Sequence, residues 1–276
     1  MLETAAFELK LDSHVAHLRL GNPQLKNALG REFFRDFSTA LGRLDETGEC
    51  RVLIISAPGP HFCSGIDLTF LGDPSLINTE NAINRERLRR LVLAMQEPIS
   101  VLQQVRFPVL AACQGASMGA ALDLLSACDM RYATKDAYFV LQEINIGLMA
   151  DLGSLQRLPA ALPEGIVREL AFTGAPLSAE RALNLGFVNE VLATHEELLT
   201  RVQAVAEVIA SRAPLAVAAS KQALNYNRSH SVAEALDYSA SLQAAVFDPA
   251  CVALSVQAMK TKARASYESL AADFQL

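Results

Sequence analysis

Residues 114–123 read QGASMGAALD, a run of small residues that ends in an acid. The run follows the short apolar stretch PVLAAC at 108–113 and leads into LLSA at 124–127. A short apolar stretch is typical of a buried strand, and small residues are typical of a tight turn before a helix, here expected over 119–127. We therefore predict a strand, a turn and a helix in succession, which is the repeating unit of α/β folds.

The same order of strand, turn and helix recurs on both sides of this stretch. Residues 6–20 alternate apolar and polar side chains, which predicts a strand pair, and residues 72–84 are polar and rich in helix breakers, which predicts a surface loop. Further buried strands are expected at 51–56, 108–113, 129–133, 137–141 and 187–191, and helices at 27–44 and 85–105. The repetition between about residues 50 and 195 predicts an α/β fold.

From residue 196 onward the sequence is helical in period, and no strand pattern follows. Its Ala-rich segments are interrupted at Pro214 and Pro249, where new helices are expected to begin. We therefore predict two regions: residues 1–195 as the α/β core with the active site, and residues 196–276 as a helical C-terminal region. A helical appendage of this kind often packs on a neighbouring subunit.

Composition narrows the class of protein. The chain has 276 residues, of which 51% are hydrophobic, and a net charge of −6. This is enough for a large core, and the acidic balance argues against nucleic acid as a partner. No apolar run is long enough to span a membrane. The five cysteines form no CxxC pair and the histidines no HExxH motif, so we expect reduced thiols and no metal site.

Location is expected to be cytoplasmic. The N-terminal residues alternate like a strand and lack a basic region followed by an apolar run, so no secretory signal is expected. The last four residues, DFQL at 273–276, differ from a peroxisomal Ser-Lys-Leu tail.

Three acids stand in otherwise apolar surroundings: Asp123, Glu143 and Asp151. Considered one at a time, each is better explained by a helix cap or a surface charge. If they converge on one apolar pocket, however, they repel one another, and at least one holds its proton near neutral pH. A carboxylate beside a carboxylic acid is the combination that a proton-transferring enzyme needs.

Two turns precede these acids and offer backbone N–H groups. In the first, HFCSGIDL at 61–68, the glycine lets a ligand approach the backbone and the N–H of Ile66 donate to it. In the second, Ala120 lies at the expected start of a helix, where free N–H groups stabilise negative charge. Together they would form an oxyanion hole. The alternatives are an ordinary turn in the first case and tight helix packing in the second.

The order of four segments resembles the enoyl-CoA hydratase/isomerase (crotonase) superfamily, over roughly residues 6–265. The segments are FCSGIDL, GASMGAALDLLSACDMRYA, LQEINIGLMADLGSLQRLP and ELAFTGAPLSAERALNLGFVNEV. Within this superfamily the chain is most similar to the Δ3,5-Δ2,4-dienoyl-CoA isomerases, which carry Asp, Glu and Asp at the positions of Asp123, Glu143 and Asp151. The hydratases have Glu, Glu and Gly there. Ala120 departs from the glycine that is common in the family, and its methyl group is expected to narrow the acyl pocket.

The resemblance implies a crotonase-like spiral of repeated ββα units with a C-terminal trimerisation region, assembled as a trimer or a dimer of trimers. It also implies a reaction of fatty acid β-oxidation, in which the double bonds of a 3,5-dienoyl-CoA move to the 2,4 positions. Glu143 and Asp151 would exchange protons with C2 and C6, in either assignment, and Asp123 would tune their pKa values. The N–H groups of Ile66 and Ala120 would hold the thioester oxygen. No metal or separate cofactor is required, because coenzyme A arrives as part of the substrate.

Substrate contacts are implied at both turns and at basic residues near the phosphates of coenzyme A. The implied residues are Ser64, Gly65, Ile66, Asp67, Leu68, Ala120, Lys26 and Lys260, with Lys262 as a further candidate. For the lysines, solvated surface positions are an equal alternative. Two other functions stay open: a 2-enoyl-CoA hydratase or other enoyl-CoA isomerase on the same scaffold, and a non-enzymatic binding protein, for instance of RNA.

Overall fold

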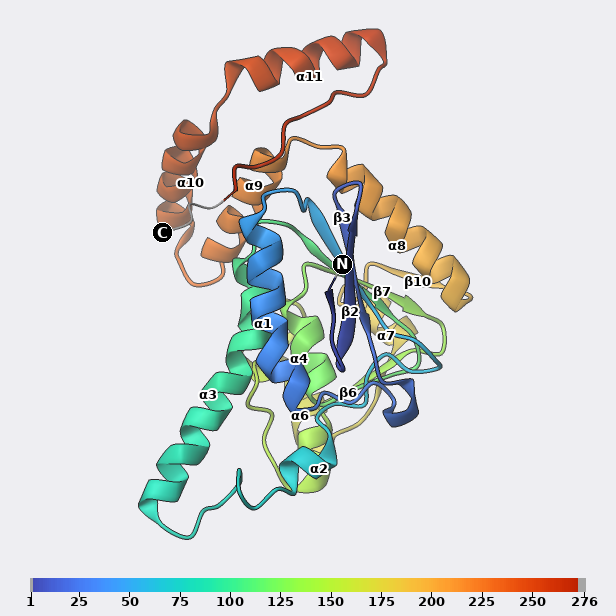
Figure 1. The fold of residues 1–276 in the computed structure, drawn as a ribbon, viewed down its shortest axis with the longest axis vertical. Helices are drawn as coiled ribbons and strands as arrows, with labels where there is room; N and C mark the ends of the chain where they lie inside the picture. The colour runs from blue at the N-terminus through green and yellow to red at the C-terminus, as the bar shows by residue number, and fades with distance from the viewer. Residues whose placement is uncertain (1, 273–276) are drawn as a thin grey trace.

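The computed structural model describes residues 2–272, so the C-terminal residues 273–276 lie outside the described part of the chain (Figure 1). A seven-stranded sheet forms the centre. In spatial order its strands are β1 (Leu2–Glu3), β2 (Phe7–Asp12), β3 (Val15–Leu20), β4 (Val52–Ser56), β5 (Val109–Cys113), β7 (Met130–Thr134) and β10 (Glu190–Leu192). The first three strands pair antiparallel, and the pairs from β3 to β10 are parallel.

A smaller sheet lies beside the large one. It consists of β6 (Ala116–Met118), β8 (Tyr138–Val140) and β9 (Leu177–Ser178) in that order. The helices are α1 (Arg31–Glu46), α2 (Leu68–Leu71), α3 (Ala82–Gln104), α4 (Ala120–Ala127), α5 (Ser154–Arg157), α6 (Glu164–Thr173), α7 (Ala179–Asn184), α8 (His195–Ala210), α9 (Pro214–Tyr226), α10 (Val232–Val246) and α11 (Pro249–Thr261). Thus β5-β6-α4 and β7-β8-α5 each place one strand in each sheet before a helix. The predicted spiral of ββα units is confirmed.

The central strands are buried on both faces, because successive side chains of a strand point to opposite sides. In β4, Leu53 and Ile55 belong to the larger core cluster, which also contains side chains of α1, α3 and α4. Val52 and Ile54 belong to a second cluster with Leu198, Val202 and Ala206 of α8. In Figure 1, α1 and α8 accordingly lie on opposite sides of the large sheet.

Two predicted elements differ from the observed ones. The helix expected over 27–44 begins only at Arg31, because Leu29 pairs with Ile66 in a β-bridge. The strand expected at 187–191 is instead β10, which starts at Glu190. Phe187 and Val188 are apolar because they fill the core, where Phe187 packs edge-on against Phe139. Buried residues outside a strand can therefore give the same apolar run in the sequence as a buried strand.

The C-terminal helices begin where the prolines predicted, since Pro214 and Pro249 each occupy the first turn of a helix. The helix α8 packs on the sheet, whereas α10 and α11 have no buried residue within the described chain. In Figure 1 α11 lies at the end of the molecule opposite to α2 and the tip of α3. The proposed division at residue 195 stays a prediction.

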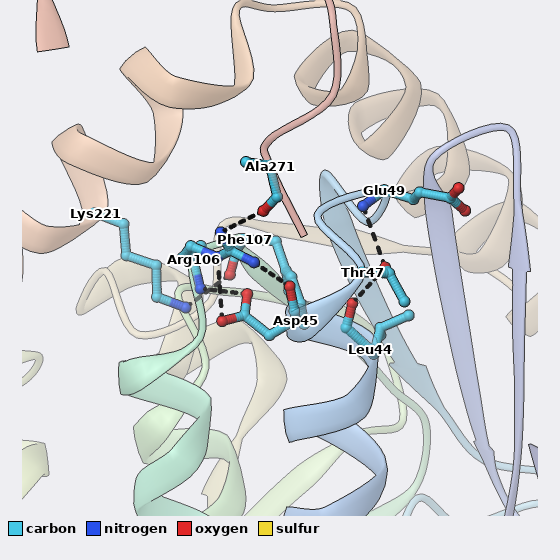
Figure 2. A network of polar contacts seen from close by, with 8 residues as sticks. All are labelled: Leu44, Asp45, Thr47, Glu49, Arg106, Phe107, Lys221 and Ala271. Carbon is cyan, nitrogen blue, oxygen red and sulfur yellow. Dashed lines mark hydrogen bonds and ion pairs between the residues drawn. The ribbon is translucent and has the colours of Figure 1, made fainter. Parts of the chain in front are cut away.

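Arg106 connects the C-terminal segment to the core (Figure 2). Its backbone N–H donates to Oδ1 of Asp45 at 3.0 Å, and its Nη1 donates to the carbonyl of Ala271 at 3.2 Å. Close by, Nζ of Lys221 on α9 donates to the carbonyl of Phe107 at 2.8 Å. These contacts join four parts of the chain at one point: α1, the α3–β5 connection, α9 and the C-terminal segment.

No single helix within residues 2–272 has both the length and the apolar character that crossing a membrane requires. Two bent helix pairs, α8 with α9 and α10 with α11, meet those two criteria only when each pair is taken together.

Candidate active site

The two turns predicted as an oxyanion hole lie side by side. The N–H of Cys63 donates to the carbonyl of Ala116 at 3.1 Å, and the N–H of Met118 donates back to Cys63 at 3.0 Å. On its other edge the first turn pairs with Leu29, whose N–H donates to the carbonyl of Gly65 at 2.8 Å. Both turns are therefore held in fixed register by backbone hydrogen bonds on either side.

Gly65 allows the close approach of these turns. Its φ is +96°, a conformation that side chains disfavour, and a methyl group on it would lie 2.7 Å from the carbonyl oxygen of Met118. The next N–H, that of Ile66, donates no backbone hydrogen bond within residues 2–272. Ala120 is the first residue of α4, where helix N–H groups lack partners in the preceding turn. Gly65 and Ala120 are neighbours, since that methyl group would lie 3.6 Å from the Ala120 nitrogen.

Asp123 lies in the first turn of α4 and is fully buried. Its Oδ1 accepts the backbone N–H of Ser154 at 2.6 Å, whereas its Oδ2 has no partner among the described residues. Burial raises the pKa of Asp123 to about 6, against the hydrogen bonds from Ser154, and the charge of Asp151 adds to the rise. The acid is thus fixed in place by one oxygen and leaves the other free.

Glu143 lies in the short 3₁₀ helix Gln142–Ile146 that follows β8. A methyl group on Gly119, which caps α4, would lie 3.1 Å from its Oε1, so the carboxyl group is next to the second turn. Its Oε2 has no partner among the described residues. Burial, and then the charges of Asp123 and Asp151, raise the pKa of Glu143 to about 7.

Asp151 completes the set, and burial raises the pKa of its carboxyl group as well. Ser154, which bonds Asp123, follows Asp151 by three residues, and Glu143 lies against Gly119, the cap of the helix that carries Asp123. The structure therefore brings all three predicted acids to the same region. Burial raises the pKa of all three groups, which favours a protonated carboxyl group beside an ionised one. Such a site can accept a proton at one position and donate one at another.

Of the other predicted contact residues, some lie beside the site and others lie far from it. Lys26 is exposed, and its carbonyl accepts the N–H of Ser64 at 3.0 Å, which places it beside the first turn. Asp67 caps α2 by accepting the N–H of Thr69 at 2.8 Å, and Leu68 is exposed. Lys260 lies on α11, at the far end of the molecule, so the structure does not bring it to this site. Lys262 ends the same helix.

Sequence reasoning missed two groups that hold the acids in place. The backbone N–H of Ser154 bonds Asp123, and the side chain of Gln96 on α3 bonds the backbone carbonyl of Asp151 at 2.6 Å. Neither contact leaves a local pattern, because each joins residues far apart in the chain. Within residues 2–272 no group of His, Cys, Asp or Glu has the arrangement of a metal site.

Comparison with known proteins assigns the fold to a family. Residues 10–270 match the family model for enoyl-CoA hydratase/isomerase. The chain belongs to this family, and the predicted resemblance is confirmed.

Two of the similar curated proteins carry the same enzyme name within this family. A peroxisomal protein of Arabidopsis thaliana named Delta(3,5)-Delta(2,4)-dienoyl-CoA isomerase is 41% identical, covering 92% of this chain and 93% of its own. A mitochondrial protein of Rattus norvegicus with the same enzyme name is 37% identical, covering 90% and 77%. Among solved structures, an enoyl-CoA hydratase from Polaromonas sp. JS666 superposes with a TM-score of 0.85 at 27% identity, covering 95% and 99%.

Proposed function

We propose that this chain is an isomerase that moves the double bonds of a 3,5-dienoyl-CoA into the 2,4 positions. The observation that carries the proposal is the placement of three carboxyl groups, Asp123, Glu143 and Asp151, beside the two turns. The isomerase names of relatives that are 37% and 41% identical support it. By the same resemblance the reaction belongs to fatty acid β-oxidation.

In the proposed mechanism the thioester oxygen accepts the N–H groups of Ile66 and Ala120. This interaction stabilises the enolate that forms when a proton leaves C2. Glu143 takes the C2 proton, the electron pair shifts along the chain, and Asp151 delivers a proton to C6. The double bonds C3=C4 and C5=C6 become C2=C3 and C4=C5, and the two acids end with exchanged protonation states. The reverse assignment of Glu143 and Asp151 gives the same balance.

The raised pKa values support proton transfer at this site in either assignment of Glu143 and Asp151. An acid of ordinary pKa would be ionised at neutral pH and have no proton to give. Burial raises the pKa of Glu143 to about 7, so this group exchanges a proton readily near neutral pH. Asp123 helps to raise it, which is the tuning role that we propose for this residue. Coenzyme A enters only as part of the substrate, and the proposal needs no other cofactor.

The decisive variant is Asp151→Asn, which keeps the shape of the side chain and removes its exchangeable proton. With 3,5-octadienoyl-CoA, we expect wild-type enzyme to raise the ultraviolet absorbance of the conjugated product and the variant to lose at least about 10²-fold in kcat. The exposed Asp136→Asn serves as the matched control and should keep full activity. Full activity of Asp151→Asn would refute the assignment.

Hydration is the second candidate, and a specific observation favours it. Oδ2 of Asp123 and Oε2 of Glu143 both lack partners among the described residues, and two free carboxyl oxygens are able to hold a water molecule. The structural relative from Polaromonas sp. JS666 is named an enoyl-CoA hydratase. Crotonyl-CoA tests this function: faster water addition to it than isomerisation of the dienoyl substrate would favour the hydratase.

Assembly as a trimer or a dimer of trimers through the C-terminal region, and a contribution of Lys26 and Lys260 to coenzyme A binding, remain part of the proposal. Because Lys260 lies at the far end of its own chain, it would act on the site of another subunit. The cytoplasmic location also stays a prediction, since the relatives named above are peroxisomal and mitochondrial. Imaging of the tagged full-length chain in its own cells would decide it.

A further inference from the structure

One face of α3 holds the segment that carries Asp151. Gln96, Ser100 and Gln103 are spaced four and three residues apart, so they share this face of the helix. Nε2 of Gln96 donates to the backbone carbonyl of Asp151 at 2.6 Å. The hydroxyl of Ser100 donates to the carbonyl of Gln96 at 2.9 Å. The helix is therefore bonded to the backbone carbonyl of Asp151 and not to its carboxyl group.

Arg157 makes the second connection to α3. Its Nε donates to Oε1 of Gln103 at 2.7 Å, and its Nη2 donates to the hydroxyl of Ser100 at 2.8 Å. Its Nη1 turns back and donates to the carbonyl of Leu152 at 3.2 Å. The guanidinium group lies against Gly153 so closely that a methyl group there would stand 1.6 Å from Nη1. We call Gln96, Ser100, Gln103 and Arg157 the polar clasp.

The segment 151–154, which the clasp holds, is also bonded to the active-site residue Asp123. The N–H of Ser154 donates to Oδ1 of Asp123 at 2.6 Å. Within residues 151–154, the carbonyl of Asp151 is bonded to Gln96 of α3 and the N–H of Ser154 to Asp123 of α4. The carbonyl of Leu152 is bonded to Arg157, which is itself bonded to α3. Fixing a backbone at three of four residues limits the positions that the Asp151 carboxyl group can take.

We propose that Gln96 and Arg157 are positioning residues, which hold Asp151 at the distance from Glu143 that proton transfer to the far end of the diene requires. This inference rests on the proposed function for its kinetic part. Neither residue is a proton carrier, since the amide of Gln96 does not titrate and Arg157 stays protonated. They act on Asp151 through the backbone of Asp151 and Leu152, and the charge of Arg157 in addition opposes the rise that burial causes in the pKa of Asp123.

The test uses the full-length enzyme with Gln96→Leu and Arg157→Met, which remove the hydrogen bonds and keep most of the side-chain volume. Ser100→Ala is a milder variant, should either of these fail to fold. The controls are Gln104→Leu, exposed one residue beyond the clasp on α3, and Arg168→Met, a surface arginine on α6. We measure amide hydrogen exchange of the peptide 150–157, and then kcat and KM with the dienoyl-CoA substrate.

In the clasp variants we expect faster exchange in 150–157, a fall in kcat of about 10²-fold and a KM within about threefold of wild type. The controls should match wild type in all three quantities. Unchanged exchange in 150–157 would overturn the clasp whatever reaction the enzyme catalyses. Faster exchange with unchanged kcat, or a rise in KM alone, would overturn its role in positioning Asp151. Wild-type enzyme that leaves dienoyl-CoA unchanged would refute the proposed function, while the exchange data would still decide whether the clasp holds the segment.

Discussion

At the scale of single residues, the buried carboxyl group of Asp123 lowers the stability of the fold when it is ionised. Burial raises its pKa from 3.8 to about 6. Between about pH 4 and pH 6 the unfolded chain releases this proton while the folded chain keeps it, so stability falls as the pH rises. Above about pH 6 Asp123 is ionised in the folded chain as well, and the loss in the free energy of unfolding is complete. At about 1.4 kcal/mol per pKa unit this loss amounts to about 3 kcal/mol.

We therefore expect Asp123→Asn to be more stable than wild type at pH 8, by up to about 3 kcal/mol, and the difference to shrink towards pH 4. The amide oxygen can still accept the N–H of Ser154, so the local geometry should persist. Urea unfolding across this pH range measures the effect, with the exposed Asp136→Asn as control. A stability difference that stays constant with pH would contradict the raised pKa.

At the scale of elements, one buried side chain of α9 makes several contacts with the core. Lys221 is buried, and its Nζ donates to the carbonyls of Leu102 at 2.7 Å and Phe107 at 2.8 Å. It also pairs with Oδ2 of Asp129 at 3.0 Å, an oxygen that accepts the N–H of Val109 as well. Burial lowers the pKa of Lys221, and the charge of Asp129 opposes this. The end of α3, the start of β5 and the residue before β7 are thus joined through α9.

Replacing Lys221 by Met should destabilise the fold by about 3 kcal/mol, because Asp129 and two carbonyls would lose a buried partner. Thermal and urea unfolding measure this loss. Lys260→Met on the exposed surface of α11 should change stability by less than about 0.5 kcal/mol. A loss below about 1 kcal/mol for Lys221→Met would mean that water reaches these groups when the ammonium group is removed.

At the scale of the whole molecule, the C-terminal helices leave a large apolar surface open. A groove of about 1400 Å³ runs between α9, α10, α11 and the segment 266–271. On α10 and α11 large hydrophobic side chains are exposed, among them Leu236 at 66% and Met259 at 71%. Large apolar side chains exposed on helices without a buried face are typical of a subunit interface. It supports the proposed self-association.

We expect sedimentation velocity of the wild-type chain to give a trimer or a dimer of trimers at micromolar concentration. Met259→Glu should shift the population to smaller species, because a charge in an apolar interface has no partner. The neighbouring exposed Gln257→Glu adds the same charge and is the control. A wild-type monomer would refute the assembly, and a Met259→Glu oligomer of normal size would place the interface elsewhere.

The sequence by itself determined most elements, the family and the three acids. Strand and helix periodicity, small-residue turns and prolines act on neighbours in the chain, so they predicted β5, α4, and the starts of α9 and α11. The order of the four family segments selected Asp123, Glu143 and Asp151. Local pattern failed at 187–191, where Phe187 is apolar because it fills the core.

Only the tertiary structure decided how the acids are held and what their surroundings do to them. The bonds of Ser154 to Asp123 and of Gln96 to Asp151 join residues 31 and 55 positions apart. The pKa values depend on burial, which is a property of the packed molecule. The same packing places α8 on the sheet and Lys260 far from its own site. Such contacts depend on how helix faces and sheet edges pack against one another in the folded molecule. No short-range spacing in the sequence encodes them.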